Sequence, residues 1–409
     1  MNNIIKISYR NLKRNSRRTI LTSSLITLGV IFVLVYTALA GGFKSYMIGQ
    51  ITDSVFGHIQ IHKKGYIASV DNLPLDKNLN KKQLEKIEKI IKDNPLVESY
   101  SYNMKFGAMF SNYTSSTNIR LNAINPDDAF KTLPLLKERA TGEGLKKGEI
   151  LVPELIAKGM KVKIGDTIVL VANNKSGSVN GINLKVAGIM TTISGPGGKD
   201  GYIHIDDAKK ALRIKGVESP EVIIRLKSLE DMPKMMNQLA PLKEMLNKNN
   251  KSMFEIHEWK QLTPFYNIVK MLDLMNVFIK VILISIVLIS ILNVMIMSVY
   301  ERIKEIGTIA AMGTTPATII KLFLAEGLML GVLGAFLGST LSLVIIKIID
   351  ISQITYSFGK QSNLILEPII KSNDIVFISI IVIIISLIAS ISPAMKAAKL
   401  DPVEALRTN

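Results

Sequence analysis

The sequence predicts an integral membrane α-helical protein with four transmembrane helices and a large extracytoplasmic α+β domain inserted between helices 1 and 2. Four charge-free apolar runs of about 20 residues each indicate the helices, at 19–40, 281–299, 327–346 and 375–395. A helix of that length crosses the roughly 30 Å hydrocarbon core at about 1.5 Å per residue. About 240 mostly polar residues separate the first two runs, so the soluble core belongs there.

The composition narrows the classes of function. The net charge is +17, which in a membrane protein mainly sets topology and attracts anionic headgroups. Aromatic residues make up only 6% of the chain, so we do not expect nucleic-acid binding. The absence of cysteine excludes disulfides, thiolate catalysis and cysteine metal ligands.

The first segment predicts the orientation. Residues 1–18 contain six Lys or Arg and no acid, so the positive-inside rule places the N-terminus in the cytoplasm. An uncleaved first helix is favoured over a cleaved signal peptide, whose apolar core would be about 7–15 residues. Both termini are then cytoplasmic in a multi-pass protein of the cell inner membrane. The expected segments start with a cytoplasmic amphipathic helix at 1–18 and a first transmembrane helix at 19–40, followed by an extracytoplasmic α+β domain with stalk helices at 41–280. Further transmembrane helices are expected at 281–299, 322–346 and 375–395, with a cytoplasmic loop at 300–321, a short external loop at 347–374 and a cytoplasmic tail at 396–409.

Two apolar stripes flank the extracytoplasmic region. We interpret them as outward helical extensions of the first two transmembrane helices that pack together as a stalk. The alternative is that each stripe packs on the outer domain. The stripes are Phe43, Met47, Ile51 and Val55, then Leu262, Phe265, Tyr266, Val269, Leu272, Met275 and Ile279.

The outer domain mixes strand and helix patterns. Helices are expected at 80–92 and 229–247, and an exposed loop is expected at 194–201. Because the two kinds of element alternate irregularly, we expect an α+β domain, with two subdomains as one option. Strands are expected at 57–62, 97–110, 117–125, 167–172, 184–189, 202–205 and 221–226.

Signatures of catalysis are missing from the sequence. It contains no Walker A, His-Glu-x-x-His or Gly-x-Ser-x-Gly pattern, so we expect no enzyme active site. His58 and His62 would lie about 13 Å apart along a strand, which is too far for one metal ion. We therefore interpret them as surface or packing histidines. Asp127-Asp128 and Asp206-Asp207 are interpreted as turn and helix-start residues.

Two features of the third transmembrane helix stand out. Glu326 is either a functional buried carboxylate or a group that reaches headgroup water or a basic neighbour such as Lys321. Four glycines on nearly one face predict close approach of another helix, from this chain or from a second subunit. They are Gly327, Gly331, Gly334 and Gly338.

Two stretches beside the membrane helices carry the most specific patterns. Residues 300–313 read Tyr-Glu-Arg-Ile-Lys-Glu-Ile-Gly-Thr-Ile-Ala-Ala-Met-Gly, a short charged helix at a membrane exit that suits docking to a cytoplasmic partner. Residues 393–407 read Pro-Ala-Met-Lys-Ala-Ala-Lys-Leu-Asp-Pro-Val-Glu-Ala-Leu-Arg, a helix exit with a stop at Asp401-Pro402.

Together these stretches resemble the FtsX/MacB-type ABC transporter permease superfamily. The family pattern has Arg…Glu-Ile-Gly and Ala-x-Gly after the second transmembrane helix, and Pro…Ala…Asp-Pro…Ala-Leu-Arg at the end. Residues 56–66, 148–152, 165–166 and 184–189, with Trp259, are most similar to the lipoprotein-releasing LolC/LolE branch. This sequence carries no nucleotide-binding domain, unlike MacB.

The resemblance implies mechanotransmission. ATP and Mg would be bound and ATP hydrolysed by a separate ABC ATPase subunit, and this chain would bind no cofactor or metal itself. A second permease subunit would pair with this one, and a lipoprotein cargo would pass to a periplasmic carrier. The implied ATPase-coupling residues are Glu301, Arg302, Glu305, Ile306, Gly307, Met312 and Gly313. The candidate cargo-contacting stalk is Phe43, Met47, Ile51, Val55, Phe265, Val269 and Leu272.

Three functions fit these expectations. The first is ATP-driven release of lipoproteins from the outer leaflet of the inner membrane. The second is MacB-like efflux of a drug, peptide or toxin. The third is a signalling permease that controls an external cell-wall hydrolase.

Overall fold

The computed structural model describes residues 2–14, 16–142, 144–174, 176–191, 200–216, 218–247, 250–358, 361–401, 403 and 405. Most of the loop expected at 194–201 lies outside the described residues, as do Pro402, Leu406 and Arg407 of the C-terminal motif. The chain forms two compact units, a helical unit of residues 1–46 and 269–409 and an α+β unit of residues 47–268.

Four long helices are apolar enough to cross a membrane. The candidate spans are Thr19–Phe56, Tyr266–Glu301, Pro316–Ser352 and Ser372–Ala398. A helix of 36 residues is about 54 Å long, so it extends well beyond the apolar run that predicted it. The helices that involve this unit are α1 (Asn2–Arg14), α2 (Ser16–Ile51), α10 (Tyr266–Glu301), α11 (Ile303–Ala311), α12 (Pro316–Ser352) and α13 (Ser372–Ala398).

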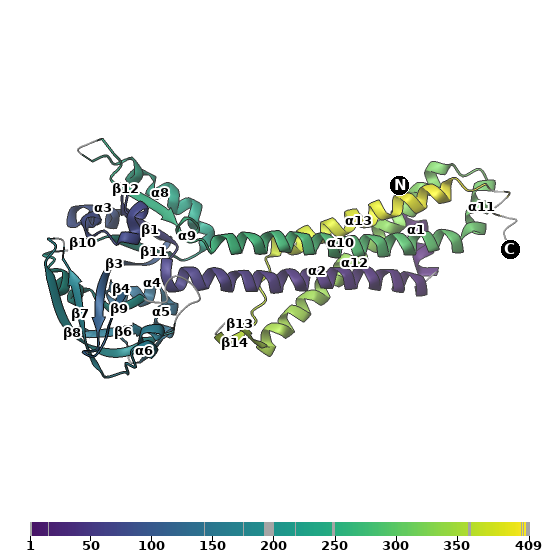
Figure 1. The fold of residues 1–409 in the computed structure, drawn as a ribbon. Coiled ribbons are helices and arrows are strands. Elements are labelled where there is room, and N and C mark those ends of the chain that lie inside the picture. The colour runs from purple at the N-terminus through teal and green to yellow at the C-terminus, as the bar shows by residue number, and fades with distance from the viewer. Residues whose placement is uncertain are drawn as a thin grey trace. The chain divides into compact units, whose positions relative to one another are not determined.

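Within the helical unit, α12 packs along α13 and against α2 (Figure 1). The buried apolar side chains at the helix contacts include Ile26, Val30, Val287, Ile291, Phe323, Leu330, Val382 and Ala389.

A β-hairpin lies between α12 and α13, where the sequence predicted only a short loop. It consists of β13 (Thr355–Phe358) and β14 (Gln361–Ile365). After it, the chain crosses α2, and the Ile369 amide donates a hydrogen bond to the Ala38 carbonyl at 2.9 Å. A Cβ at Gly42 would lie 1.8 Å from the Glu367 carbonyl oxygen, so this crossing requires glycine.

The α+β unit contains an antiparallel four-stranded layer. Its order is β12 (Phe254–Glu258), β1 (Ile59–Lys63), β11 (Glu221–Leu226) and the first half of β3 (Val97–Ser111). The helices that pack on it are α3 (Lys81–Ile91), α8 (Met232–Glu244), α4 (Pro126–Thr132) and α5 (Pro134–Glu138).

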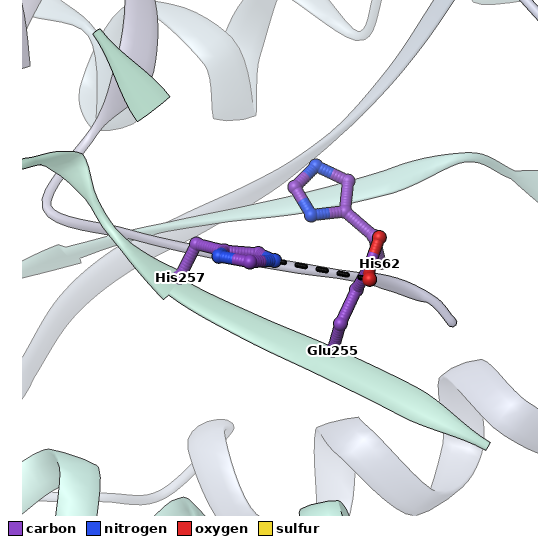
Figure 2. Close-up of side chains that lie close together, drawn as sticks. All are labelled: His62, Glu255 and His257. Carbon is purple, nitrogen blue, oxygen red and sulfur yellow. Dashed lines mark ion pairs between the residues drawn. The ribbon is translucent and has the colours of Figure 1, made fainter. Parts of the chain in front are cut away.

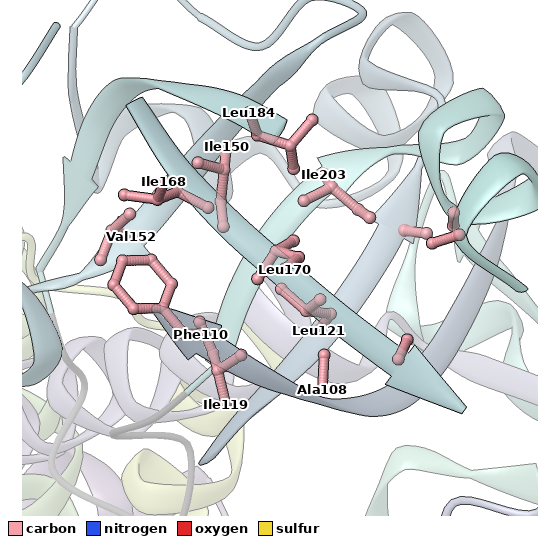
Figure 3. Packing of buried hydrophobic residues seen from close by; sticks show 14 of the residues in the cluster. Ala108, Phe110, Ile119, Leu121, Ile150, Val152, Ile168, Leu170, Leu184 and Ile203 are labelled. Atoms are coloured by element: carbon pink, nitrogen blue, oxygen red, sulfur yellow. The ribbon is translucent and has the colours of Figure 1, made fainter. Parts of the chain in front are cut away.

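The second half of β3 belongs to a closed ring of six strands. The ring continues through β4 (Ser116–Ile124), β9 (Asp200–His204), β6 (Glu149–Pro153), β8 (Val179–Met190) and β7 (Thr167–Asn173), and β7 pairs with β3. Alternate side chains point inward and fill the interior, as the buried residues in Figure 3 show. The expected α+β domain therefore has two parts that share one long strand.

The remaining elements are short. They are β2 (Leu79–Asn80), β5 (Ala140–Gly142), β10 (Glu218–Ser219), α6 (Glu154–Gly159), α7 (Ile205–Leu212), α9 (Trp259–Leu262), a π-helical turn at Thr52–Phe56 and 3₁₀ turns at Ile67–Asn72, Leu75–Lys77 and Leu229–Asp231.

Most of the expected strands and helices are confirmed. Each of the seven expected strands overlaps an observed one, although Ile205 begins α7 instead of ending β9. The helix expected at 229–247 is shorter, because a 3₁₀ turn precedes Met232 and the helix ends at Glu244. Asp127-Asp128 and Asp206-Asp207 lie in the first turns of α4 and α7, as expected.

Candidate functional site

The most concentrated group of buried charges in the described part of the helical unit surrounds the joint between α10 and α11. Arg302 is the single residue between these helices, and its backbone is non-helical, with φ −114° and ψ 18°. The apolar α10 ends at Glu301, and Glu301 and Arg302 are the first charged residues after Lys280, so the helix ends where charges return. A change in the angle between α10 and α11 would therefore act on Arg302.

Arg302 is held by two carboxylates. Its Nη1 donates to both oxygens of Glu326 on α12, at 3.0 and 3.3 Å, and its Nε donates to Glu305 Oε2 at 3.0 Å. The exposed fraction is 6% for Arg302 and 1% for Glu326. Burial by itself lowers the pKa of Arg302, but Glu326 and Glu305 outweigh it and raise the pKa above its usual value.

Helix α1 contributes to the same cluster. Asn11 Nδ2 donates to Glu326 Oε1 at 3.0 Å, and Arg14 forms an ion pair with Glu305. Three segments thus meet in a charged junction, defined here as Asn11, Arg14, Arg302, Glu305 and Glu326. The junction links the N-terminal helix, the α10–α11 joint and α12 through charge-assisted hydrogen bonds.

The junction gives Glu326 the basic neighbour that one of the two interpretations expected: its partner is Arg302, which lies 24 residues away in sequence. On α1, Ser8 and Leu12 are the buried side chains, whereas Ile5 and Tyr9 are 47% and 61% exposed. The helix also ends at Arg14, four residues before the predicted end.

The residues implied in ATPase coupling divide into two groups. Arg302, Ile306 and Gly307 are buried within the unit. The accessible positions are Glu301, Glu305, Met312 and Gly313. Met312 is 73% exposed, an unusual position for a large apolar side chain in water.

The glycines of α12 contact two different helices of the same chain. A Cβ at Gly327 would lie 2.8 Å from Ser390 Cβ, and one at Gly331 would lie 2.7 Å from Ser386 Cβ, both on α13. Further along, Gly334 faces Ile26 and Gly338 faces Val30, both on α2. The single glycine face predicted from sequence therefore serves two intramolecular contacts.

A second feature of the helical unit is an apolar cavity of about 410 Å³. At its wall, Tyr36 Oη donates to Asn276 Oδ1 at 2.7 Å, which joins α2 to α10. Lys44 pairs with Asp273 at 2.5 Å further along the same helices. The cavity is lined by Tyr36, Leu39, Ala40, Phe43, Leu272, Met275, Asn276, Tyr356 and Leu366.

The candidate cargo-contacting residues are divided between the two units. Phe43 and Leu272 line the cavity, whereas Ile51 and Val269 are buried, at 8% and 2% exposure. The other three, all partly buried, belong to the α+β unit: Met47, Val55 and Phe265. Tyr36, Leu39 and Tyr356 were missed because their grouping depends on where the β13–β14 hairpin folds.

His58 has the packing role that was one of the two interpretations: it is buried, and its Nδ1 accepts a hydrogen bond from the Leu226 amide at 2.9 Å. His62 is also buried. It lies beside Glu255 and His257 of β12 (Figure 2), residues that no local spacing in the sequence connects to it.

Comparison with known proteins agrees with this architecture. Residues 19–242 match the MacB-like periplasmic core domain, and residues 277–402 match the FtsX-like permease C-terminal domain. The lipoprotein-releasing system transmembrane protein LolC of Xylella fastidiosa is 23% identical over 316 residues, covering 70% of this chain and 72% of LolC.

Two further relatives align along nearly the whole chain. An uncharacterized ABC transporter permease of Methanocaldococcus jannaschii is 23% identical, and the alignment spans 100% of this chain and 98% of the relative. The pyoverdine export ATP-binding/permease protein PvdT of Pseudomonas fluorescens is 25% identical, and 98% of this chain covers 59% of it. With the four apolar helices and the α+β unit after the first, these matches place the chain in the FtsX/MacB-type family of ABC transporter permeases.

Proposed function

We propose that this permease releases lipoproteins from the outer leaflet of the inner membrane by mechanotransmission. The observation that carries the proposal is the apolar cavity between α2, α10 and the β13–β14 hairpin. Its volume of about 410 Å³ falls in the range of about 300–1,000 Å³ that ligand sites occupy. Each buried methylene contributes about 0.8 kcal/mol, so acyl chains would bind there favourably.

Energy would enter from a separate ABC ATPase subunit, which would hold ATP and Mg. With both termini cytoplasmic, α11 would face that subunit and present Glu301, Glu305, Met312 and Gly313. A push on α11 would reach Arg302 and, through the ion pair, Glu326 of α12. It would also reach α10, which continues from the joint to the cavity wall at Asn276 and Leu272.

Cargo would leave when the cavity changes shape. Because α2 and α10 are joined at Tyr36–Asn276 and Lys44–Asp273, displacement of α10 would alter the lining that both helices share. The α+β unit would then pass the released lipoprotein to a periplasmic carrier. A second permease subunit, identical or related, would complete the transporter.

Export of a small molecule is the second candidate, and one observation favours it. The alignment with the pyoverdine exporter covers 98% of this chain, whereas that with LolC covers 70%. An exporter of this type would use the same α11 coupling surface but would not need acyl chains in the cavity.

Site-specific photocrosslinking in cells separates these candidates. A photoreactive residue at Met275, which lines the cavity, is expected to capture lipoproteins labelled with a clickable fatty acid. The same residue at Leu274, which is 58% exposed and outside the cavity lining, is the matched control. Equal labelling at both positions, or none at Met275 while transport of the chain's substrate continues, would contradict acyl binding in the cavity.

A further inference from the structure

A histidine- and carboxylate-rich group lies at the edge of the four-stranded layer, outside the coupling and cavity regions. In the β1–β12 register, His62 lies opposite Glu255 and Gln60 lies opposite His257. Because residues two apart on a strand share a face, His62, Glu255 and His257 all project from the same face of the sheet. Figure 2 shows the two imidazole rings and the Glu255 carboxylate converging.

The spacing suits a single metal ion. One ligand atom from each of the three residues lies within 4.8 Å of the others. Tetrahedral Zn²⁺ with bonds of about 2.0–2.1 Å holds its ligand atoms about 3.4 Å apart, so modest side-chain rotation closes the site. Glu221 Oε2 lies 3.7 Å from His62 Nε2 but already accepts a hydrogen bond from Lys105 Nζ at 3.0 Å, so the three-residue group is the site.

The His62 side chain indicates that a ligand belongs here. His62 is 0% exposed, and neither of its ring nitrogens has a hydrogen-bond partner among the described residues. His257 Nε2 also has no hydrogen-bond partner there. A buried polar atom without a partner costs roughly 1–3 kcal/mol, and a coordinated cation would satisfy one nitrogen of each ring.

The surroundings hold the donors in place. The two oxygens of Glu255 accept hydrogen bonds from the backbone amides of Gly65, at 3.1 Å, and Ile67, at 2.8 Å. Tyr66 stacks on His62 with ring centroids 5.0 Å apart and covers it. A carboxylate has about four lone-pair positions, so Glu255 keeps capacity for a metal bond after both amide contacts.

We propose that His62, Glu255 and His257 form a binding site for a divalent transition-metal ion of the Zn²⁺ class. Two imidazoles with a carboxylate suit Zn²⁺ and its neighbours in the first transition series, whereas Mg²⁺ and Ca²⁺ select oxygen ligands. The ion clamps the edge strand β12 to β1, immediately before α9 and the start of α10 in the chain. This site does not depend on the proposed transport function.

Metal binding is measured on the full-length chain in detergent, stripped with EDTA and titrated with ZnCl₂ against a chromophoric chelator. We expect one Zn²⁺ per chain and no competition from MgCl₂. His257→Asn and Glu255→Gln should each weaken Zn²⁺ binding at least tenfold. His204→Asn is the control, since it removes another of the four histidines but keeps an acceptor for the Asp206 amide at the start of α7.

A second measurement needs no variant. Co²⁺ bound by the unaltered chain should give a visible absorption band that stoichiometric ZnCl₂ removes. Absence of stoichiometric Zn²⁺ uptake by the unaltered chain would overturn the proposal. So would equal Zn²⁺ affinity of the His257→Asn and His204→Asn proteins, or displacement of Zn²⁺ by equimolar MgCl₂.

Discussion

Arg302 and Glu326 form a buried ion pair, with Nη1–Oε distances of 3.0 and 3.3 Å, that ties the α10–α11 joint to α12. The pair connects the helix implied in ATPase docking to the helix that packs on both α2 and α13 through its glycines. In the proposed mechanism, this connection would carry force from the docking helix to α12.

Breaking this pair should destabilise the helical unit. Glu326→Gln leaves the buried Arg302 charge with only the more exposed Glu305 carboxylate, and loss of the buried partner costs up to roughly 3–5 kcal/mol in comparable pairs. We expect a lower thermal midpoint in detergent and reduced membrane abundance. Lys321→Gln, an exposed change five residues earlier on α12, is the control. If the double variant Arg302→Met with Glu326→Leu were as unstable as Glu326→Gln, the unpaired charge would not be the cause.

Met312 should contribute to ATPase docking. The Met312 side chain is 73% exposed in this chain, and a docked partner would bury it. Met312→Asp would therefore place a charge in an apolar contact. We expect co-purification of the cognate ATPase to fall about tenfold, the effect of about 1.4 kcal/mol. Ile351→Asp is the control, because it also places a charge at an exposed apolar residue: Ile351 is 70% exposed and lies near the far end of α12. An equal loss in both variants would point to a general defect.

Gly42 should tolerate no side chain. Gly42→Ala places a Cβ 1.8 Å from the Glu367 carbonyl oxygen, a backbone atom that cannot move without displacing the 366–370 segment. Overpacking of this kind costs roughly 1–3 kcal/mol, so the thermal midpoint should fall. Gly49→Ala lies on the same helix, where the Cβ would be 3.6 Å from Asp53 Oδ2. The Gly49→Ala control should be neutral or slightly stabilising. An equal decrease of the thermal midpoint in both variants would show that the clash with the crossing segment is not the cause.

Acid should destabilise the α+β unit partly through His58. Burial, followed by the Arg225 charge, lowers the pKa of His58 from 6.5 to about 4. Between these values the unfolded chain binds a proton that the folded chain does not, so stability falls as pH falls from 6.5 towards 4. The contribution is roughly 3 kcal/mol.

His58→Asn isolates this effect, because the Asn oxygen keeps an acceptor for the Leu226 amide but does not titrate. Unfolding measured at pH 7 and pH 4 should show the unaltered protein losing more stability than the variant. A stability difference between the two proteins that stays constant with pH would exclude His58 as the titrating group.

Local patterns predicted the elements well for clear physical reasons. Membrane helices follow from unbroken apolar runs, since a bilayer admits only segments that satisfy their backbone hydrogen bonds internally. Helix α3 follows from the apolar spacing of Leu84, Ile87 and Ile91 and from the Asn80 cap. The β13–β14 hairpin was missed; one contact of its first strand, the edge-to-face packing of Tyr356 on Tyr46, joins residues far apart in the sequence.

The sequence by itself determined the membrane helices, the intervening α+β domain and the family, because hydropathy, periodicity and the two motifs are properties of contiguous residues. Tertiary structure alone decided the partner of Glu326, the two helices that the α12 glycines contact and the meeting of His62 with His257. Those relationships join residues 24 to 308 positions apart. Their side-chain distances depend on how the folded elements pack, which no local pattern encodes.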